Sequence, residues 1–266
     1  MKINNFSLYF KKLNITPSKP SLELVKEIQK NHISTFSFNN IAVLQKQNIS
    51  LDIDDILEKL VNKNLGGYCF EHNKLLYEVL KALGFEVRIL IAKVLNNLDV
   101  DSPRTHRITL LSFDNKQYLV DVGFGSVCPL SPLDINDTNH HEKYRIVKNE
   151  SDDYQLELKT FNKHFILYKF NLENYTEADC IMGNFYSSNY KDAVFVNNFV
   201  ISLRLLDCTY SLRNHIYHKI YKDKTDVTTI LNDTQLYEII TKDFNIPIAK
   251  QEVQNLFKII SILKLK

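Results

Sequence analysis

Asn64-Leu-Gly-Gly-Tyr-Cys-Phe-Glu-His72 is the stretch that restricts the fold of this chain most strongly. Its glycine pair lets the backbone turn sharply just before Cys69. Apolar side chains recur at helical spacing from Cys69 to Leu83, and Gly84 stands where a helix would end. We therefore expect Cys69 to open a helix, where the helix dipole favours a thiolate over a thiol.

A histidine and an aspartate follow this cysteine. His106 lies 37 residues after Cys69 (106 − 69 = 37), and Asp121 lies 15 residues after His106 (121 − 106 = 15). If Asp114-Asn115 is a two-residue hairpin turn, Ile108 faces Asp121 and His106 is its diagonal neighbour on the same sheet face. Such neighbours are roughly 7–8 Å apart, so an imidazole and a carboxylate can meet. The pattern predicts a thiol nucleophile, a base and a carboxylate that orients the base.

Each residue also has a simpler interpretation. A lone cysteine is often just a small buried hydrophobe, and a cross-strand His/Asp pair can be an ordinary polar contact. Against this, four of the six glycines flank Cys69 or Asp121. His72, three residues after Cys69, is a rival base, but no carboxylate is placed to orient it and we expect it to face solvent.

The apolar pattern changes its period along the chain. It predicts helices over 21–32, 53–61 and 69–83, and then strands over 85–94, 107–113, 116–122, 143–148, 154–159 and 164–170. Beyond residue 192 it predicts strands at 194–196 and 200–206 and helices at 235–244 and 249–260. Sequential strands with short turns imply an antiparallel meander or small barrel, so the expected fold is α+β in three compact segments, 1–84, 85–191 and 192–266.

The composition of the chain limits which classes of binding partner and cofactor we expect. Lys and Arg number 33 against 31 Asp and Glu, a net charge of +2, which does not favour nucleic acid or a membrane as the main partner. No apolar run resembles a signal peptide or a membrane span. Four scattered cysteines (Cys69, Cys128, Cys180, Cys208) indicate free thiols in the cytoplasm. We expect no metal, because His140-His141 with Glu142, and His215 with His218, lack a matching ligand set.

At these motifs the chain resembles the arylamine N-acetyltransferases. The resemblance rests on Gly66-Gly-Tyr-Cys-Phe-Glu71 with Asn73, on Pro103-Arg-Thr-His106 and on Tyr118-Leu-Val-Asp-Val-Gly-Phe-Gly125. It also includes His32 to Ile41 and, more loosely, Asn184 to Phe195. It covers most of the chain and implies a helical bundle (1–84) that carries Cys69, an antiparallel β-barrel (85–191) and an α/β lid (192–266). It also implies a cysteine-protease-like triad of Cys69, His106 and Asp121.

The resemblance also implies a function in xenobiotic metabolism. Its members transfer acetyl from acetyl-CoA to arylamines, arylhydrazines or N-hydroxyarylamines, by a ping-pong route through an acetyl-cysteine. The implied substrate contacts are Phe38, Tyr68, Thr105 and Phe124. The implied CoA contacts are Gly123, Gly125 and Ser126.

Two positions depart from the family pattern. The family usually has Arg before Gly-Gly, where this chain has Leu65, and Glu in Pro-Phe-Glu-Asn, where this chain has Asn39. If that Arg and Glu normally pair, losing both leaves no unpaired charge. These departures bear on pocket shape and acceptor preference.

Three other functions compete with this one. They are an amide synthase of the same fold acting on a carrier-bound acyl chain, a papain-like cysteine protease and a non-catalytic acyl-CoA binder. The complete set of catalytic residue types disfavours the binder, and the missing secretory signal and disulfide framework disfavour the protease. The sequence does not indicate an oligomeric state.

Overall fold

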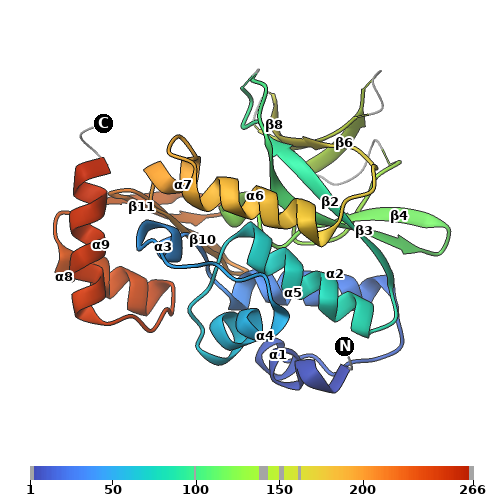
Figure 1. Cartoon of the computed structure of the whole chain (residues 1–266), viewed down its shortest axis with the longest axis horizontal. Helices are drawn as coiled ribbons and strands as arrows, with labels where there is room; N and C mark the ends of the chain where they lie inside the picture. Colours follow the sequence, from blue (N-terminus) through green and yellow to red (C-terminus); the bar gives the residue numbers. More distant parts are fainter. Residues whose placement is uncertain (1–2, 99, 138–142, 150–152, 161–162, 264–266) are drawn as a thin grey trace.

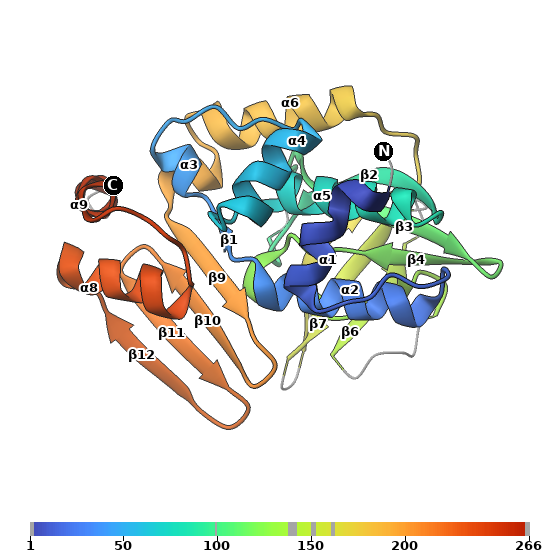
Figure 2. The same ribbon diagram turned by 90° about the horizontal axis from the view of Figure 1, so that it is seen from below.

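The computed structural model describes residues 3–98, 100–137, 143–149, 153–160 and 163–263. Helices from the first third of the chain pack beside a strongly curved antiparallel sheet (Figure 1). A second sheet and the C-terminal helices lie on the other side of the helices (Figure 2). None of the described helices is long and apolar enough to cross a membrane.

The first third is helical, as predicted. Ser21 caps the second helix by accepting a hydrogen bond from the backbone N–H of Leu24 at 3.2 Å. The predicted helix over 53–61 is also present, although its second half has π-type turns. The helical elements here are η1 (Ile3–Phe6), α1 (Ser7–Leu13), α2 (Leu22–Thr35), α3 (Ile41–Leu44), α4 (Ile53–Ile56), η2 (Leu57–Asn62) and α5 (Cys69–Ala82).

Helix α5 has the start and the end that its sequence predicts. Glu71 turns back to accept a hydrogen bond from the backbone N–H of Tyr68 at 3.1 Å, which fixes the first turn. Gly84, with φ +89°, ends the helix in the left-handed region. The face predicted to point inward is buried against the other N-terminal helices. Cys69 is thus held at the mouth of a well-anchored helix.

Seven antiparallel strands form the larger sheet, which is nearly closed into a barrel (Figure 1). Their order is β5-β4-β3-β2-β8-β7-β6. The bounds are β2 (Glu86–Val94), β3 (Arg104–Phe113), β4 (Lys116–Val120), β5 (Leu133–Asp134), β6 (Tyr144–Lys148), β7 (Tyr154–Lys159) and β8 (His164–Phe170). The α+β class and the antiparallel barrel predicted from the sequence are confirmed.

The β3–β4 hairpin has the predicted register. Asp114 and Asn115 both have positive φ, 50° and 58°, as a tight two-residue hairpin turn requires. Phe113 pairs with Lys116, so the numbers of paired residues sum to 229 throughout the hairpin. The strands therefore bring residues 106 and 121 to the same end of the sheet.

A second sheet, of order β1-β9-β10-β11-β12, carries the C-terminal helices on one face (Figure 2). Its first strand comes from the N-terminal third, with Phe38 opposite Ser202. The chain segments therefore interlock around the region next to Cys69. The bounds are β1 (Phe38–Asn39), β9 (Val200–Arg204), β10 (Cys208–Arg213), β11 (Ile216–Tyr221), β12 (Thr225–Thr229), α8 (Asp233–Glu238), η4 (Ile239–Asp243) and α9 (Lys250–Leu263).

For one segment the sequence predicted the wrong type of secondary structure. Residues 194–196, predicted as a strand, belong to the short helix α7 (Val194–Asn197). Asn197 donates side-chain hydrogen bonds to the carbonyls of Lys191 and Ala193, which closes the turn, and no strand lies beside this segment in the described sheets. The β-propensity of Val-Phe-Val is thereby overridden.

Candidate active site

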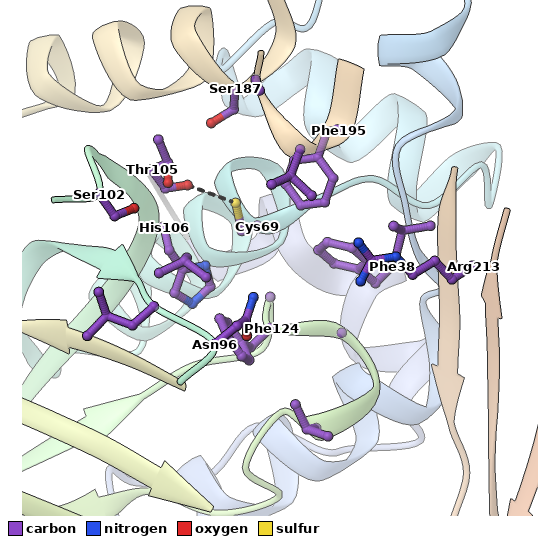
Figure 3. A pocket seen from close by; sticks show the side chains of 18 of the residues that line it. Phe38, Cys69, Asn96, Ser102, Thr105, His106, Phe124, Ser187, Phe195 and Arg213 are labelled. Carbon is purple, nitrogen blue, oxygen red and sulfur yellow. Dashed lines mark hydrogen bonds between the residues drawn. The ribbon is translucent and has the colours of Figure 1, made fainter. Parts of the chain in front are cut away.

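Cys69 lines a cavity between the helices and the two sheets (Figure 3). Its side chain is 2% exposed. The loop before it is held to β1, because the backbone N–H of Asn39 donates to the Gly67 carbonyl at 2.6 Å. The sulfur is thereby fixed at the cavity wall.

His106 and Asp121 form the expected pair. His106 Nε2 lies 2.7 Å from Asp121 Oδ2, and both side chains are buried. A carboxylate can only accept, so Nε2 carries the proton and Nδ1 is left as the acceptor. Figure 3 shows the His106 ring beside Cys69 in the same cavity. The structure therefore brings the three residues together.

Asp121 is held by further donors. Its Oδ1 accepts from Asn73 Nδ2 at 2.9 Å and from the backbone N–H of Gly123 at 2.8 Å, and its Oδ2 also accepts from the Tyr168 hydroxyl at 3.0 Å. Burial alone would raise the pKa of this carboxyl. The charge and hydrogen bond of His106, with the bonds from Asn73 and Gly123, instead hold its pKa below the usual value, so it stays ionised.

The surroundings of Cys69 favour its thiol form. Burial, and then the negative charge of Asp121, raise the pKa of Cys69, while the backbone N–H groups of Phe70 and Arg107 only partly offset them. The thiol donates weakly to the Thr105 carbonyl at 3.6 Å. Desolvation at this buried position therefore opposes the preference for a thiolate that the helix dipole gives.

The cavity has a volume of about 430 Å³. Of the predicted substrate contacts, Phe38, Thr105 and Phe124 line it, as do the predicted CoA contacts Gly123, Gly125 and Ser126. The structure adds lining residues from α7 and from α6 (Glu177–Asn189), among them Phe195, Tyr186 and Ser187.

Tyr68 does not line the cavity. It is fully buried, and its hydroxyl donates to Asn184 of α6. Its ring packs edge-on against Phe195, with ring centroids 5.6 Å apart. Tyr68 thus supports an aromatic wall of the cavity from behind, without reaching the space that a substrate would occupy.

The turn after Asp121 needs its glycines. A Cβ on Gly123 would lie 2.8 Å from the Cα of Cys69, so only glycine lets this turn approach α5 closely. Gly125 has φ +71° and leads into a single 3-10 turn, η3 (Gly125–Val127). The turn therefore presents backbone at the cavity floor beside the thiol.

Two residues that hold Asp121 were missed from the sequence. Asn73 accepts from the backbone N–H of Val122 at 3.0 Å and donates to Asp121, and Tyr168 of β8 also donates to Asp121. The position of Asn73, four residues after Cys69, places it on the same helix face and could have suggested a role. No local pattern marks Tyr168, because strand β8 reaches the site only through the sheet.

His72 is not placed to act as a base for Cys69, and its predicted exposure is wrong. It is buried, and its Nε2 lies 3.1 Å from the Gly67 carbonyl. A carbonyl only accepts, so Nε2 donates. Burial lowers the pKa of His72 to about 4 and keeps the ring neutral, so Nδ1 accepts from His32 Nε2 at 2.8 Å. His32 Nδ1 then accepts from the Tyr9 hydroxyl at 2.9 Å. Both ring nitrogens of His72 are thus used in a neutral chain of hydrogen bonds.

His215 and the His140-His141-Glu142 group were among the residues considered as metal ligands. His215 is buried beside the Ile230 carbonyl, at 3.3 Å from Nδ1. His140, His141 and Glu142 lie outside the described residues. Within the described part of the chain, no three His, Cys, Asp or Glu side chains gather as a metal site would require.

Comparisons with known proteins agree with this geometry. A family model described as N-acetyltransferase matches residues 21–253. The arylamine N-acetyltransferase of Escherichia coli (strain K12) is 33% identical over 205 residues, which cover 75% of this chain and 73% of that protein. The structure of the Salmonella typhimurium arylamine N-acetyltransferase matches 98% of this chain and 100% of its own, with a TM-score of 0.91 and 25% identity. The Mycobacterium marinum enzyme in complex with CoA has the same fold, with a TM-score of 0.89 and 23% identity over 97% of this chain and 99% of its own.

Proposed function

Because this chain belongs to the arylamine N-acetyltransferase family and is therefore an acyltransferase, we propose that it acetylates aromatic amines, hydrazines or N-hydroxyarylamines from acetyl-CoA through an acetyl-Cys69 intermediate. The observation that carries this proposal is the buried His106–Asp121 pair, 2.7 Å apart, beside Cys69 in an aromatic-lined cavity.

The first half-reaction begins with a proton transfer. The pKa of Cys69 is raised by burial, so the thiol loses its proton to His106 Nδ1 as it attacks, and Asp121 stabilises the imidazolium. The sulfur bonds to the thioester carbonyl carbon, and backbone N–H groups near Cys69 hold the oxyanion. The bond to the CoA sulfur then breaks, and His106 returns the proton to that sulfur.

The second half-reaction reverses these roles. The nitrogen of the amine attacks the carbonyl of acetyl-Cys69, and His106 takes the proton that this nitrogen loses. The C–S bond breaks, the amide leaves, and the proton returns to Cys69. A flat, weakly basic amine suits this step, because it is neutral near physiological pH and can enter past Phe38 and Phe124.

The two ends of the cavity suit different substrates. Gly123, Gly125 and Ser126 present backbone and a hydroxyl that fit the CoA side, and the M. marinum relative was solved with CoA. Phe38, Thr105 and Phe124 fit the acceptor side. The four free cysteines are consistent with a cytoplasmic enzyme.

Peptide mapping after brief exposure to acetyl-CoA, without acceptor, tests this function. We expect label on Cys69 and none on Cys128, Cys180 or Cys208, followed by release when an aromatic amine is added. Stable label on another cysteine would refute the assignment. A papain-like protease would not be acetylated, and an amide synthase would accept only a carrier-bound acyl chain.

A further inference from the structure

Ser187 carries a buried hydroxyl without a partner. Its side chain is 3% exposed, and its Oγ has no hydrogen bond among the described residues. Ser187 lines the cavity that contains Cys69. Figure 3 shows its hydroxyl directed from α6 into the cavity, on the side where Ser102 and Thr105 lie.

The neighbouring serine shows what is unusual here. A helical serine commonly bonds the carbonyl four residues earlier, and the Ser188 Oγ does so with the Asn184 carbonyl at 2.7 Å. Ser187, in the same helix, makes no such bond to Gly183. A buried hydroxyl without a protein partner is destabilising, so a group that binds in the cavity and pairs with it gains a hydrogen bond.

The surroundings favour a neutral partner. The cations behind α6, Lys74 and Arg107, are both bound to Glu177. Among the described lining residues, Arg213 is the only lysine or arginine, and it reaches in from β10 near Phe38. A carboxylate beside Ser187 would therefore lose its hydration without gaining a cation.

We propose that Ser187 is a specificity residue that hydrogen-bonds a neutral hydroxyl or ether substituent on the aromatic ring of the acceptor. This inference rests on the proposed acetyl transfer, and it concerns only which amines the enzyme prefers. Ser187 takes no part in the proton transfers at Cys69.

Matched acceptors test this role. Aminophenol and toluidine differ by a hydroxyl and a methyl group of similar size, and both the 3- and the 4-isomers are compared. In Ser187→Ala, kcat/KM for the aminophenol that reaches residue 187 should fall about 3- to 10-fold, while kcat/KM for the matching toluidine stays within about twofold. For each amine, kcat/KM of the wild type is divided by kcat/KM of the variant, so that differences in intrinsic nucleophilicity between the amines cancel.

Further measurements separate a hydrogen bond at Ser187 from a general effect of the substitution on packing. Ser188→Ala, the control, should not distinguish the two amines, and single-turnover acetylation of Cys69 should be unchanged in Ser187→Ala. Equal losses for aminophenols and toluidines, or slower Cys69 acetylation, would overturn the role of Ser187. So would a larger loss for 4-aminobenzoate than for either aminophenol. Absence of acetylation in the wild-type enzyme would instead refute the proposed function. Ser187→Cys, which keeps a side chain of similar size, repeats the test if the alanine variant does not fold.

Discussion

Asp121 accepts a pair of hydrogen bonds on each carboxylate oxygen: from Asn73 and Gly123 on Oδ1, and from His106 and Tyr168 on Oδ2. A carboxylate held this way has one orientation, so the imidazole that it binds also has one orientation and one neutral tautomer. The lowered pKa of Asp121 keeps it ionised when His106 becomes positive. At the scale of single residues, the imidazole that we propose as the base is therefore fixed in place before any substrate arrives.

The choice of base can be tested at this scale. His106→Ala removes the proton acceptor, and because burial keeps Cys69 as a thiol, single-turnover acetylation by acetyl-CoA should slow by roughly 10⁴-fold. Asp121→Asn should behave similarly, because an amide can hold the ring in the wrong tautomer. His72→Gln should cost about tenfold at most, since both nitrogens of His72 already have other partners.

The measurement is the rate of Cys69 acetylation in each variant across pH. The control is thermal unfolding of all three variants, which separates loss of the base from loss of the fold. An inactive His72 variant together with a His106 variant of near-normal rate would mean that His106 is not the base and that the proposed triad is wrong.

At the scale of elements, local chemistry decided which features the sequence could predict. The two-residue turn at Asp114-Asn115 fixes the β3–β4 register, so the contact between His106 and Asp121 followed from counting residues. Helix α6 was missed although Thr176 and Asp179 form a capping box at its start, with the Thr176 N–H bonded to Asp179 at 2.7 Å. Strand β12 was missed because every residue in it is exposed, so it has no apolar alternation.

Other features depend on contacts that no local pattern encodes. The helical form of 194–197 comes from side-chain bonds of Asn197, and the burial of His72 comes from its contact with α2. The local sequence does not distinguish Ser187 from other serines in helices. Only the assembled cavity shows that its hydroxyl is left without a partner. Tertiary packing therefore determines these roles.

The two departures from the family pattern meet at the contact between β1 and the loop before α5. Asn39 Nδ2 donates to the Leu65 carbonyl at 3.0 Å, so the two positions are adjacent. Leu65→Arg alone, or Asn39→Glu alone, would place a charge without its partner and should lower the free energy of unfolding by about 1–3 kcal/mol. The double variant should recover most of this loss.

Urea unfolding of the two single variants and the double variant checks this coupling. A double variant whose loss equals the sum of the single losses would show that the side chains do not interact. Unfolding of Asn39→Ala serves as the control, because it removes the present hydrogen bond without adding charge.

At the scale of the whole molecule, a buried polar chain ties the N-terminal helices together. Tyr9 of α1 donates to His32 of α2, which donates to His72 of α5, and His72 donates to the Gly67 carbonyl beside Cys69. The direction of every bond requires both histidines to be neutral. Burial lowers the pKa of His72 to about 4, and burial together with the charge of His72 lowers that of His32 well below its usual value.

The free energy of unfolding should therefore fall as the pH falls from about 6.5 to 4. In this range the unfolded chain binds protons at these histidines and the folded chain does not. The free energy of unfolding is therefore highest above the pKa that histidine has in the unfolded chain, and it falls as the pH drops below that pKa. His72 should contribute a loss of about 2 kcal/mol between pH 7.5 and pH 5, and His32 should add to this loss in the same direction. Urea titrations at several pH values measure this slope. His72→Gln should lower the slope by close to one proton, whereas His164→Gln, a change at an exposed residue, should leave it unchanged. An unaltered slope in the His72 variant would mean that the chain tolerates a charged imidazole and does not depend on neutral histidines.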